Sequence, residues 1–341
     1  MAQLLTLASV IAAGAPMLGF LAVVWWLDRY DREPVWLISA VFMWGAVGAI
    51  LLALPASLVV HVGMLQALTL IEAPVWLLER VAVVLVAPIA EEPAKALILG
   101  IVLYNRHFDN MTDGFVYGAA AGLGFGMTEN LWYFLTLQPD LPTWGSTVVI
   151  RTLYSAVMHA TATAILGAAL GRARFQPGPV LALHGLGGLT GAISVHLVWN
   201  ALASSPSEQL WLADLVLLPL EVALVFGVFQ LCLLDESHTI RTELADEATR
   251  GLLPEAHPDI LASWRKRNLP GWLPEQVDHD HYVRVATDLA MRKRQQRELG
   301  QRAPMFYGLE IARLRDEIVG MLSEGPTTRG SPAPPPGRRT T

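Results

Sequence analysis

The sequence predicts an all-α protein: a polytopic membrane helix bundle of about seven transmembrane helices, or eight if one long segment is split, with a small soluble C-terminal tail. Of its 341 residues, 53% are hydrophobic and 16% are charged, and the mean hydropathy is +0.42. Soluble domains carry about 25% charged residues, so this composition excludes an ordinary water-soluble globule. The charge is also uneven, because residues 1–234 hold 22 charged residues and residues 235–341 hold 32. The first part is therefore predicted to lie in the membrane and the last part in water.

Seven apolar stretches are long enough for a transmembrane helix, which needs about 20 apolar residues. They lie at residues 4–27, 35–60, 75–103, 114–136, 147–170, 180–203 and 210–234. The first has no basic leading segment and is too long for a signal peptide, so it is interpreted as a retained span. The third contains Pro88 and Pro93, which predict a kink or a break into two helices.

Arginine in the connecting loops predicts the orientation of the bundle. The loops after the first, third and fifth spans are basic and include Arg32, Arg106 and Arg172. The alternate loops carry no Lys or Arg; they are residues 61–74, 137–146 and 204–209. Because cytoplasmic loops are enriched in these residues, the N-terminus is expected outside and the C-terminus in the cytoplasm. The chain is therefore expected to be a multi-pass protein of a bacterial-type cell membrane.

The chain is expected to divide into three parts. Residues 1–234 form the membrane domain, and residues 235–324 form a partly helical cytoplasmic tail of mixed charge. Residues 325–341 are rich in Pro, Gly and Thr and are expected to be disordered. The tail carries equal numbers of acidic and basic residues, so nothing indicates a nucleic-acid partner.

Ionisable groups inside the predicted spans are the main functional signal, because each costs about 2.5–3.5 kcal/mol at the bilayer centre. These ionisable groups and two amide side chains lie on four neighbouring spans. They are Glu91, Glu92, Lys95, Glu129, Asn130, His159, His196 and Asn200. Helical spacing puts Lys95 within reach of both carboxylates on its own span and places Asn200 one turn after His196. The four spans are expected to bring these groups into one layer of the bilayer.

Two chemistries fit this set of residues. A buried carboxylate beside imidazoles can act as a general base toward water, with an amide donor for the oxyanion. Alternatively, two histidines and a glutamate can hold a catalytic zinc ion that keeps one position open. The sequence has no HExxH motif, which excludes the usual zincin arrangement. Both alternatives remain open from the residues alone.

Four motifs over residues 20–204 resemble those of the PrsW intramembrane proteases, in the wider group that includes the CAAX prenyl endopeptidases (CPBP). They are EEPAK, FGMTEN with Phe125, Glu129 and Asn130, a mid-helix His159, and HLVWN with His196 and Asn200. The prenyl endopeptidases have a histidine at the position of Glu129, which favours the PrsW branch. The tail lies outside the resemblance.

The resemblance implies a role for each of these side chains. Glu91 would activate water with Glu92 as its partner, and Lys95 would hold this carboxylate pair. His159 and His196 would bind or polarise the reacting centre, and Asn200 would stabilise the oxyanion. Glu129 would be a ligand or a second carboxylate, so that His159, His196 and Glu129 would bind a metal, zinc by preference, if one is used. The residues do not decide whether the protease is of the metallo or the glutamic type.

An intramembrane endopeptidase is therefore the expected function. The expected partners are the lipid bilayer and single-span membrane proteins, with regulators such as anti-sigma factors as substrates implied by the resemblance. A proton-coupled secondary transporter and a non-catalytic membrane scaffold are the alternatives, because Glu and His chains also relay protons. The concentration of the polar groups in one layer favours the protease.

Overall fold

The computed structural model describes residues 2–28, 30, 32–136, 140–204 and 208–323, and every regular element in these ranges is a helix. They form two compact units, Met1–Ser237 and His238–Thr341. The predicted all-α class is confirmed. The predicted disordered end at 325–341 lies outside the described residues.

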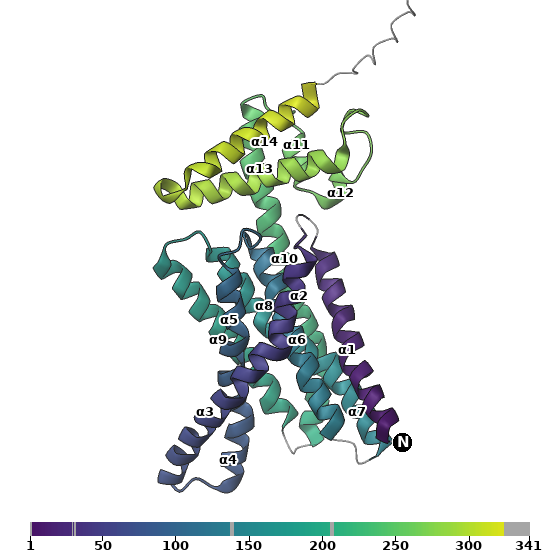
Figure 1. Ribbon diagram of the computed structural model, residues 1–341, viewed down its shortest axis with the longest axis vertical. Coiled ribbons are helices and arrows are strands. Elements are labelled where there is room, and N and C mark those ends of the chain that lie inside the picture. Colours follow the sequence, from purple (N-terminus) through teal and green to yellow (C-terminus); the bar gives the residue numbers. More distant parts are fainter. Residues whose placement is uncertain (1, 29, 31, 137–139, 205–207, 324–341) are drawn as a thin grey trace, which may run out of the picture. The chain divides into compact units, whose positions relative to one another are not determined.

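The first unit is built of helices (Figure 1). In chain order they are α1 (Ala2–Leu27), α2 (Val35–Met43), η1 (Trp44–Ala49), α3 (Ile50–Leu70), α4 (Val75–Val81), η2 (Ala82–Val86), α5 (Ala87–Val102), α6 (Met111–Thr136), α7 (Leu141–Ile150), η3 (Arg151–Ser155), α8 (Ala156–Ala173), α9 (Gly178–Ala203) and the start of α10 (Glu208–Thr249). The helix α10 continues past residue 237 into the second unit.

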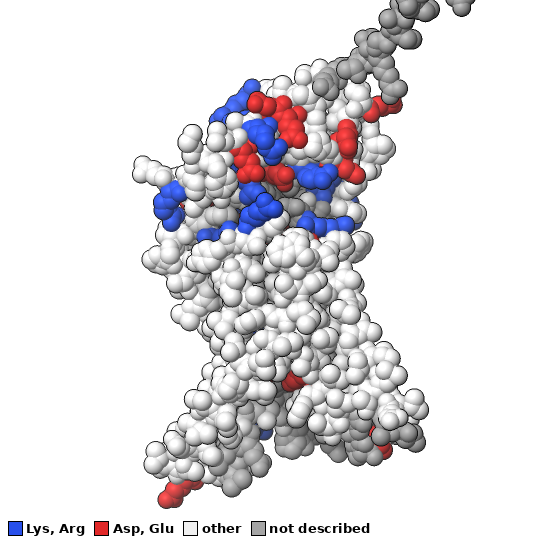
Figure 2. Space-filling view, viewed as in Figure 1, with Lys and Arg blue, Asp and Glu red and all other residues white. Residues whose placement is uncertain are grey.

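Four helical stretches of the described chain are long and apolar enough to cross a membrane. They are Gln3–Leu27, Val35–Leu70, Leu141–Ala173 and Gly178–Ala203. On the face drawn in Figure 2, most of this first unit is free of charged residues. The protein is therefore membrane-embedded, although the predicted count of seven or eight spans is not confirmed. The predicted span at 75–103 is a continuous run of α4, η2 and α5, without a break at Pro88 or Pro93.

The helix α6 forms the centre of the first unit, and nearly all of its first sixteen residues are buried. Glycines let α8 approach it closely: a Cβ atom at Gly122 would overlap the carbonyl of His159, and one at Gly114 would overlap the carbonyl of Gly167. These glycines of α6 thus let the backbone of α8 lie directly against the backbone of α6, as in other small-xxx-small contacts between helices. This contact fixes the depth of His159 relative to α6.

Three π-helical turns interrupt the helices of the first unit. The turn η1 separates α2 from α3, η2 leads directly into α5, and η3 leads directly into α8. Single π turns inside α-helices are frequent at functional sites. Here two of them immediately precede the helices that carry Glu91 and His159, so the local winding sets the direction of both side chains.

The second unit contains the end of α10 and four further α-helices. These are α11 (His257–Leu261), α12 (Trp264–Arg267), α13 (His279–Leu299) and α14 (Met305–Ser323), with the short turn η4 (Gly300–Arg302). Two of them, α13 and α14, are long, with 21 and 19 residues. Their apolar faces bury Tyr282, Leu289, Ile311 and Leu314, and this packing supports their length.

Candidate active site

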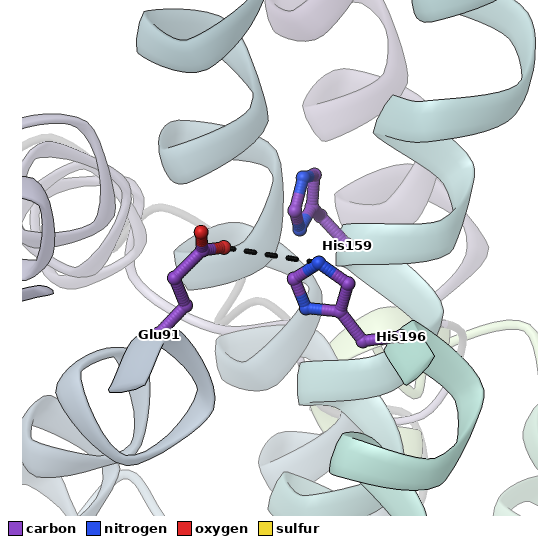
Figure 3. Close-up of side chains that lie close together, drawn as sticks. All are labelled: Glu91, His159 and His196. Atoms are coloured by element: carbon purple, nitrogen blue, oxygen red, sulfur yellow. Dashed lines mark ion pairs between the residues drawn. The ribbon is translucent and has the colours of Figure 1, made fainter. Parts of the chain in front are cut away.

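The polar side chains of the four predicted motifs meet inside the first unit. The helix α5 contributes Glu91, Glu92 and Lys95, whereas α6 contributes Glu129. The helices α8 and α9 contribute one histidine each. Figure 3 shows Glu91, His159 and His196 pointing toward one another from three helices. The sequence predicts that these groups share one layer of the bilayer. In the structure they form a single cluster.

The ring of His196 is oriented by a buried carboxylate. Its Nδ1 lies 2.7 Å from Glu92 Oε1, and the same oxygen accepts a hydrogen bond of 2.6 Å from Lys95 Nζ. The hydroxyl of Thr163 donates to the other oxygen of Glu92 at 3.3 Å. Because Nδ1 donates its hydrogen to Glu92, the lone pair of His196 lies on Nε2. That atom faces the carboxylate of Glu91, 3.8 Å away.

The carboxylate of Glu91 lies close to two basic groups, but its Oε2, which is buried, has no hydrogen-bond partner among the described residues. Lys95 Nζ and His196 Nε2 both lie 3.8 Å from this oxygen. A buried carboxylate oxygen without a hydrogen bond is costly, so it points to a ligand or a reactant at this position.

The second histidine is held from both sides. Lys95 Nζ lies 2.9 Å from His159 Nδ1, and Glu129 Oε2 lies 2.6 Å from His159 Nε2. A lysine ammonium can only donate, so Nδ1 accepts and the ring hydrogen sits on Nε2, where it is donated to Glu129. Phe125 lies against the ring of His159 and against Lys95, whose Nζ is 4.1 Å from the centre of the phenyl ring. Phe125 of the FGMTEN motif thus packs directly on the cluster.

Arg151 is a member of the site that the motifs do not include. Its guanidinium lies 2.7 Å from Glu129 Oε2 and donates to Asn130 Oδ1 at 3.0 Å and to the hydroxyl of Ser155 at 3.2 Å. It also lies 3.7 Å from the ring centre of Tyr133. No spacing rule links residues 129 and 151, so its partner could not be identified from sequence.

Asn200 lies beside the cluster but uses its amide elsewhere. It lines the same cavity as the histidines, and its Nδ2 donates to the carbonyl of Val83 at 3.0 Å. Val83 belongs to the π turn η2, so this bond ties α9 to the segment that leads into α5. The oxyanion role expected for Asn200 stays a prediction. Asn130 is likewise tied to backbone and to Arg151.

Among the described residues, two cavities reach the cluster, and they differ in size and lining. The larger, of about 510 Å³, is lined by Glu91, Glu129, Arg151 and both histidines. The smaller, of about 290 Å³, is lined mainly by α3 and α6, with Glu91 and Glu129 in its wall. The side chain of Glu92 is fully buried, whereas those of Glu91 and Glu129 are 14% and 24% exposed. Water can therefore reach Glu91 and Glu129, but not Glu92.

The residues present fit a divalent metal ion. One ligand atom each from Glu91, His159 and His196 lies within 4.8 Å of the others. Ligand atoms on a tetrahedral zinc are about 3.4 Å apart, given bonds of about 2.0–2.2 Å, so small side-chain rotations would close this set. Two histidines and one glutamate are also a known catalytic zinc donor set. His159 would have to give up its Nε2 hydrogen to join it.

A helical membrane bundle that gathers imidazoles and carboxylates beside a cavity supplies the groups that an intramembrane hydrolase requires. The family model described as "PrsW family intramembrane metalloprotease" matches residues 33–230. "Protease PrsW" of Bacillus subtilis is 32% identical over 178 residues, which covers 49% of this chain and 70% of the relative. "Protease PrsW" of Geobacillus kaustophilus is 30% identical over 169 residues, covering 49% and 68%. No solved structure matches. The chain belongs to the PrsW family of intramembrane metalloproteases.

Proposed function

We propose that this protein hydrolyses peptide bonds inside the bilayer, in single-span regulatory proteins of the anti-sigma-factor type. The observation that carries the proposal is the buried Glu91 Oε2, which makes no hydrogen bond with the described residues and faces His196 Nε2 at 3.8 Å. It lies in the wall of a cavity of about 510 Å³ that is large enough for water and a peptide segment. Membership of a metalloprotease family supports the reaction class.

Glu91, His159 and His196 would hold the metal, which supplies the Lewis acid that polarises the scissile carbonyl. The sequence resemblance gives water activation to Glu91 and makes Glu129 either a ligand or a second carboxylate. The geometry instead favours Glu91 as the ligand, because it faces the cluster with an unbonded oxygen. One ligand atom of Glu91 lies within 4.8 Å of both histidines, whereas Glu129 is already paired with Arg151 and His159.

The remaining side chains orient the cluster and move the proton. Glu92 fixes the ring of His196 through Nδ1, and this carboxylate–histidine arrangement is typical of metal-binding histidines. Glu129 is held in place by Arg151 and is the more exposed of the two cavity-lining carboxylates. We assign to Glu129 the transfer of a proton from the attacking water to the leaving amine.

The site's location restricts its substrates. The cluster lies on helices of a membrane-embedded unit, so only a chain that brings its scissile bond to that depth can be cut. A helix keeps its carbonyls hydrogen-bonded, so attack requires local unwinding, which helix-breaking residues favour. Single-span proteins meet these requirements. The arginine-bearing loops support an outside N-terminus and a cytoplasmic C-terminus, with residues 1–234 as the protease domain and 235–324 as an accessory tail.

Two conservative variants test this assignment in purified, reconstituted protein. We expect Glu91→Gln to lose both bound metal and peptide cleavage, whereas Glu129→Gln should keep the metal and lose cleavage at least about a hundredfold. Metal content is measured by elemental mass spectrometry. Cleavage is measured with model single-span peptides, with and without chelator. The reverse pattern would show that Glu91 is the base and Glu129 the ligand. Near-normal cleavage by both variants would reject the site.

The masses of the peptide products test the location of cleavage. We expect cuts within the apolar span of the model substrate. Products that map only to its soluble flanks would show that the buried cluster is not where the peptide bond breaks.

A further inference from the structure

The smaller cavity, bounded by α3, α5 and α6, differs in character from the larger one. Its inner end is formed by Ala53 and Phe125, which are 4% and 2% exposed. Its rim is formed by Leu54 and Trp132, which are 66% and 68% exposed on the apolar outer surface of the membrane unit. The cavity therefore runs from the surface that contacts lipid acyl chains to the carboxylate of Glu91.

The two cavities share one wall. Glu91, Glu129 and Tyr133 line both of them, and the histidines and Arg151 line only the larger cavity. A peptide bond placed beside these carboxylates would extend one neighbouring side chain into the smaller cavity. The larger cavity would remain open to water and the polar atoms of the reaction.

Side-chain hydrogen bonds keep the smaller cavity open. The hydroxyl of Thr128, in its wall, donates to the carbonyl of Ala46 at 2.7 Å. The indole of Trp44 donates to the carbonyl of Ala94 at 3.1 Å. These bonds tie the π turn η1 to α6 and to α5, so the walls are held by polar contacts that do not depend on a ligand. At about 290 Å³ the space is at the lower limit of ligand pockets, which suits a side chain.

We propose that this cavity is a specificity subsite, which binds an aliphatic side chain next to the scissile bond of the membrane substrate. The proposal rests on the proposed peptidase function and adds the substrate class that the site selects. An apolar side chain is favoured because the lining, apart from the shared carboxylates, is mainly Ile50, Ala53, Leu54 and Phe125. The rim on the outer surface lets a transmembrane segment deliver that side chain laterally from the bilayer.

The first test changes the size of the cavity. Ala53→Leu fills its inner end, and Ser57→Leu narrows it nearer the rim without changing a fully buried residue. Ala67→Leu is the matched control, since it makes the same change at an exposed position on the same helix. Each protein is assayed with single-span peptides that carry Ala, Val, Leu or Phe on either side of the cut.

We expect the wild type and the Ala67→Leu control to prefer Leu. In the other two variants, the ratio of kcat/KM for the Leu peptide over that for the Ala peptide should fall by about 10-fold or more. Such a change is in the range that one methylene or more produces in an apolar pocket. An unchanged ratio in both variants, with cleavage retained, would overturn the subsite while leaving the peptidase function in place.

A crosslinking experiment decides the occupant without relying on cleavage. Single-span peptides that carry photo-leucine, scanned one position at a time, are irradiated with the full-length protein in vesicles. We expect one position to crosslink to α3 near Ser57 or to α6 near Trp132, and Ser57→Leu to reduce that product. Crosslinks there from a photoreactive lipid, with none from any peptide, would show a lipid site instead. Absence of peptide cleavage by the wild type would count against the proposed function alone.

Discussion

Each of the two units buries a glutamate between two basic side chains, and the comparison separates a structural cluster from a reactive one. In the membrane unit, Glu92 contacts Lys95 and His196. In the C-terminal unit, Glu247 lies 2.7 Å from Lys293 and 2.6 Å from Arg315. Both glutamate side chains are almost completely buried, at 0% and 1% exposed.

The two clusters differ in where their contacts lead. Lys293 also pairs with Asp246 at the surface, and Arg315 is itself 32% exposed, so the network around Glu247 ends in solvent. The network around Glu92 instead leads through His196 to Glu91 Oε2, which makes no hydrogen bond with the described residues and borders a cavity. Burial of an ion pair is therefore not what marks the site. Glu243 Oε1 of the C-terminal unit also makes no hydrogen bond with the described residues, but it pairs with the exposed Arg297 at 2.7 Å. The distinguishing feature of Glu91 is its place in the wall of a cavity.

The largest expected effect comes from removing either imidazole. His159→Ala and His196→Ala should each lower cleavage by about a hundredfold or more, because both rings are held in the cluster by carboxylates. His184→Ala is the control: its half-buried ring lines neither cavity of the site, and its Nδ1 lies near the carbonyl of Val180 on the same helix. The measurement is cleavage of a reconstituted single-span peptide. Equal losses in all three variants would indicate a general defect of folding.

A smaller effect is expected from the partner of Glu129. Arg151→Gln removes the cation that holds this carboxylate and leaves Asn130 and Tyr133 without their arginine contact. We expect cleavage to fall about 10–100-fold, as for other side chains that orient reactive groups. Metal content should be unchanged, which distinguishes this loss from that of Glu91→Gln. Full activity would show that Glu129 needs no positioning.

In the C-terminal unit, the corresponding change should affect stability and not catalysis. Glu247→Gln leaves Lys293 and Arg315 without their shared carboxylate, and we expect a loss of about 1–3 kcal/mol from the free energy of unfolding of this unit. Both cations can turn toward solvent, which limits the cost. Thermal unfolding and peptide cleavage are measured on the same preparation. A selective loss of cleavage would show that this unit takes part in the reaction.

The smallest effect is a pH dependence of the same unit. Burial raises the pKa of Glu247, but hydrogen bonds from Arg315 and Lys293 outweigh it and hold the pKa below the usual 4.5. Because the pKa is lower in the folded state, its contribution is complete above pH 4.5 and is lost as the pH falls through the folded value. Comparing wild type and Glu247→Gln between about pH 7 and about pH 3 should show the difference between them shrinking. A constant difference would contradict the assignment.

Much of the fold and of the cluster could be predicted from the sequence, for identifiable reasons. Charged residues in apolar stretches are costly, so Glu91, Glu129 and His159 could be recognised without coordinates. Their contacts within one helix follow from spacing, as for Glu92 and Lys95. Pairing between helices does not follow from spacing, so the sequence alone does not predict the ion pair between Arg151 and Glu129. The engagement of Asn200 with Val83 depends on a π turn, which no hydrophobic pattern reveals.

The π turns also affect how this chain tolerates changes in length. A π turn accommodates one more residue than an α-helical turn in about the same rotation, whereas removing a residue from a regular α-helix rotates the remainder by about 100°. Deleting one residue within Ala82–Val86 would thus restore regular winding and keep Glu91 directed at the histidines, whereas a deletion within Val75–Val81 or residues 87–90 would turn it away. The π turns are therefore the places where these helices can lose one residue and keep the cluster assembled. Gaps in alignments of related chains should accordingly be sought first at Trp44–Ala49, Ala82–Val86 and Arg151–Ser155.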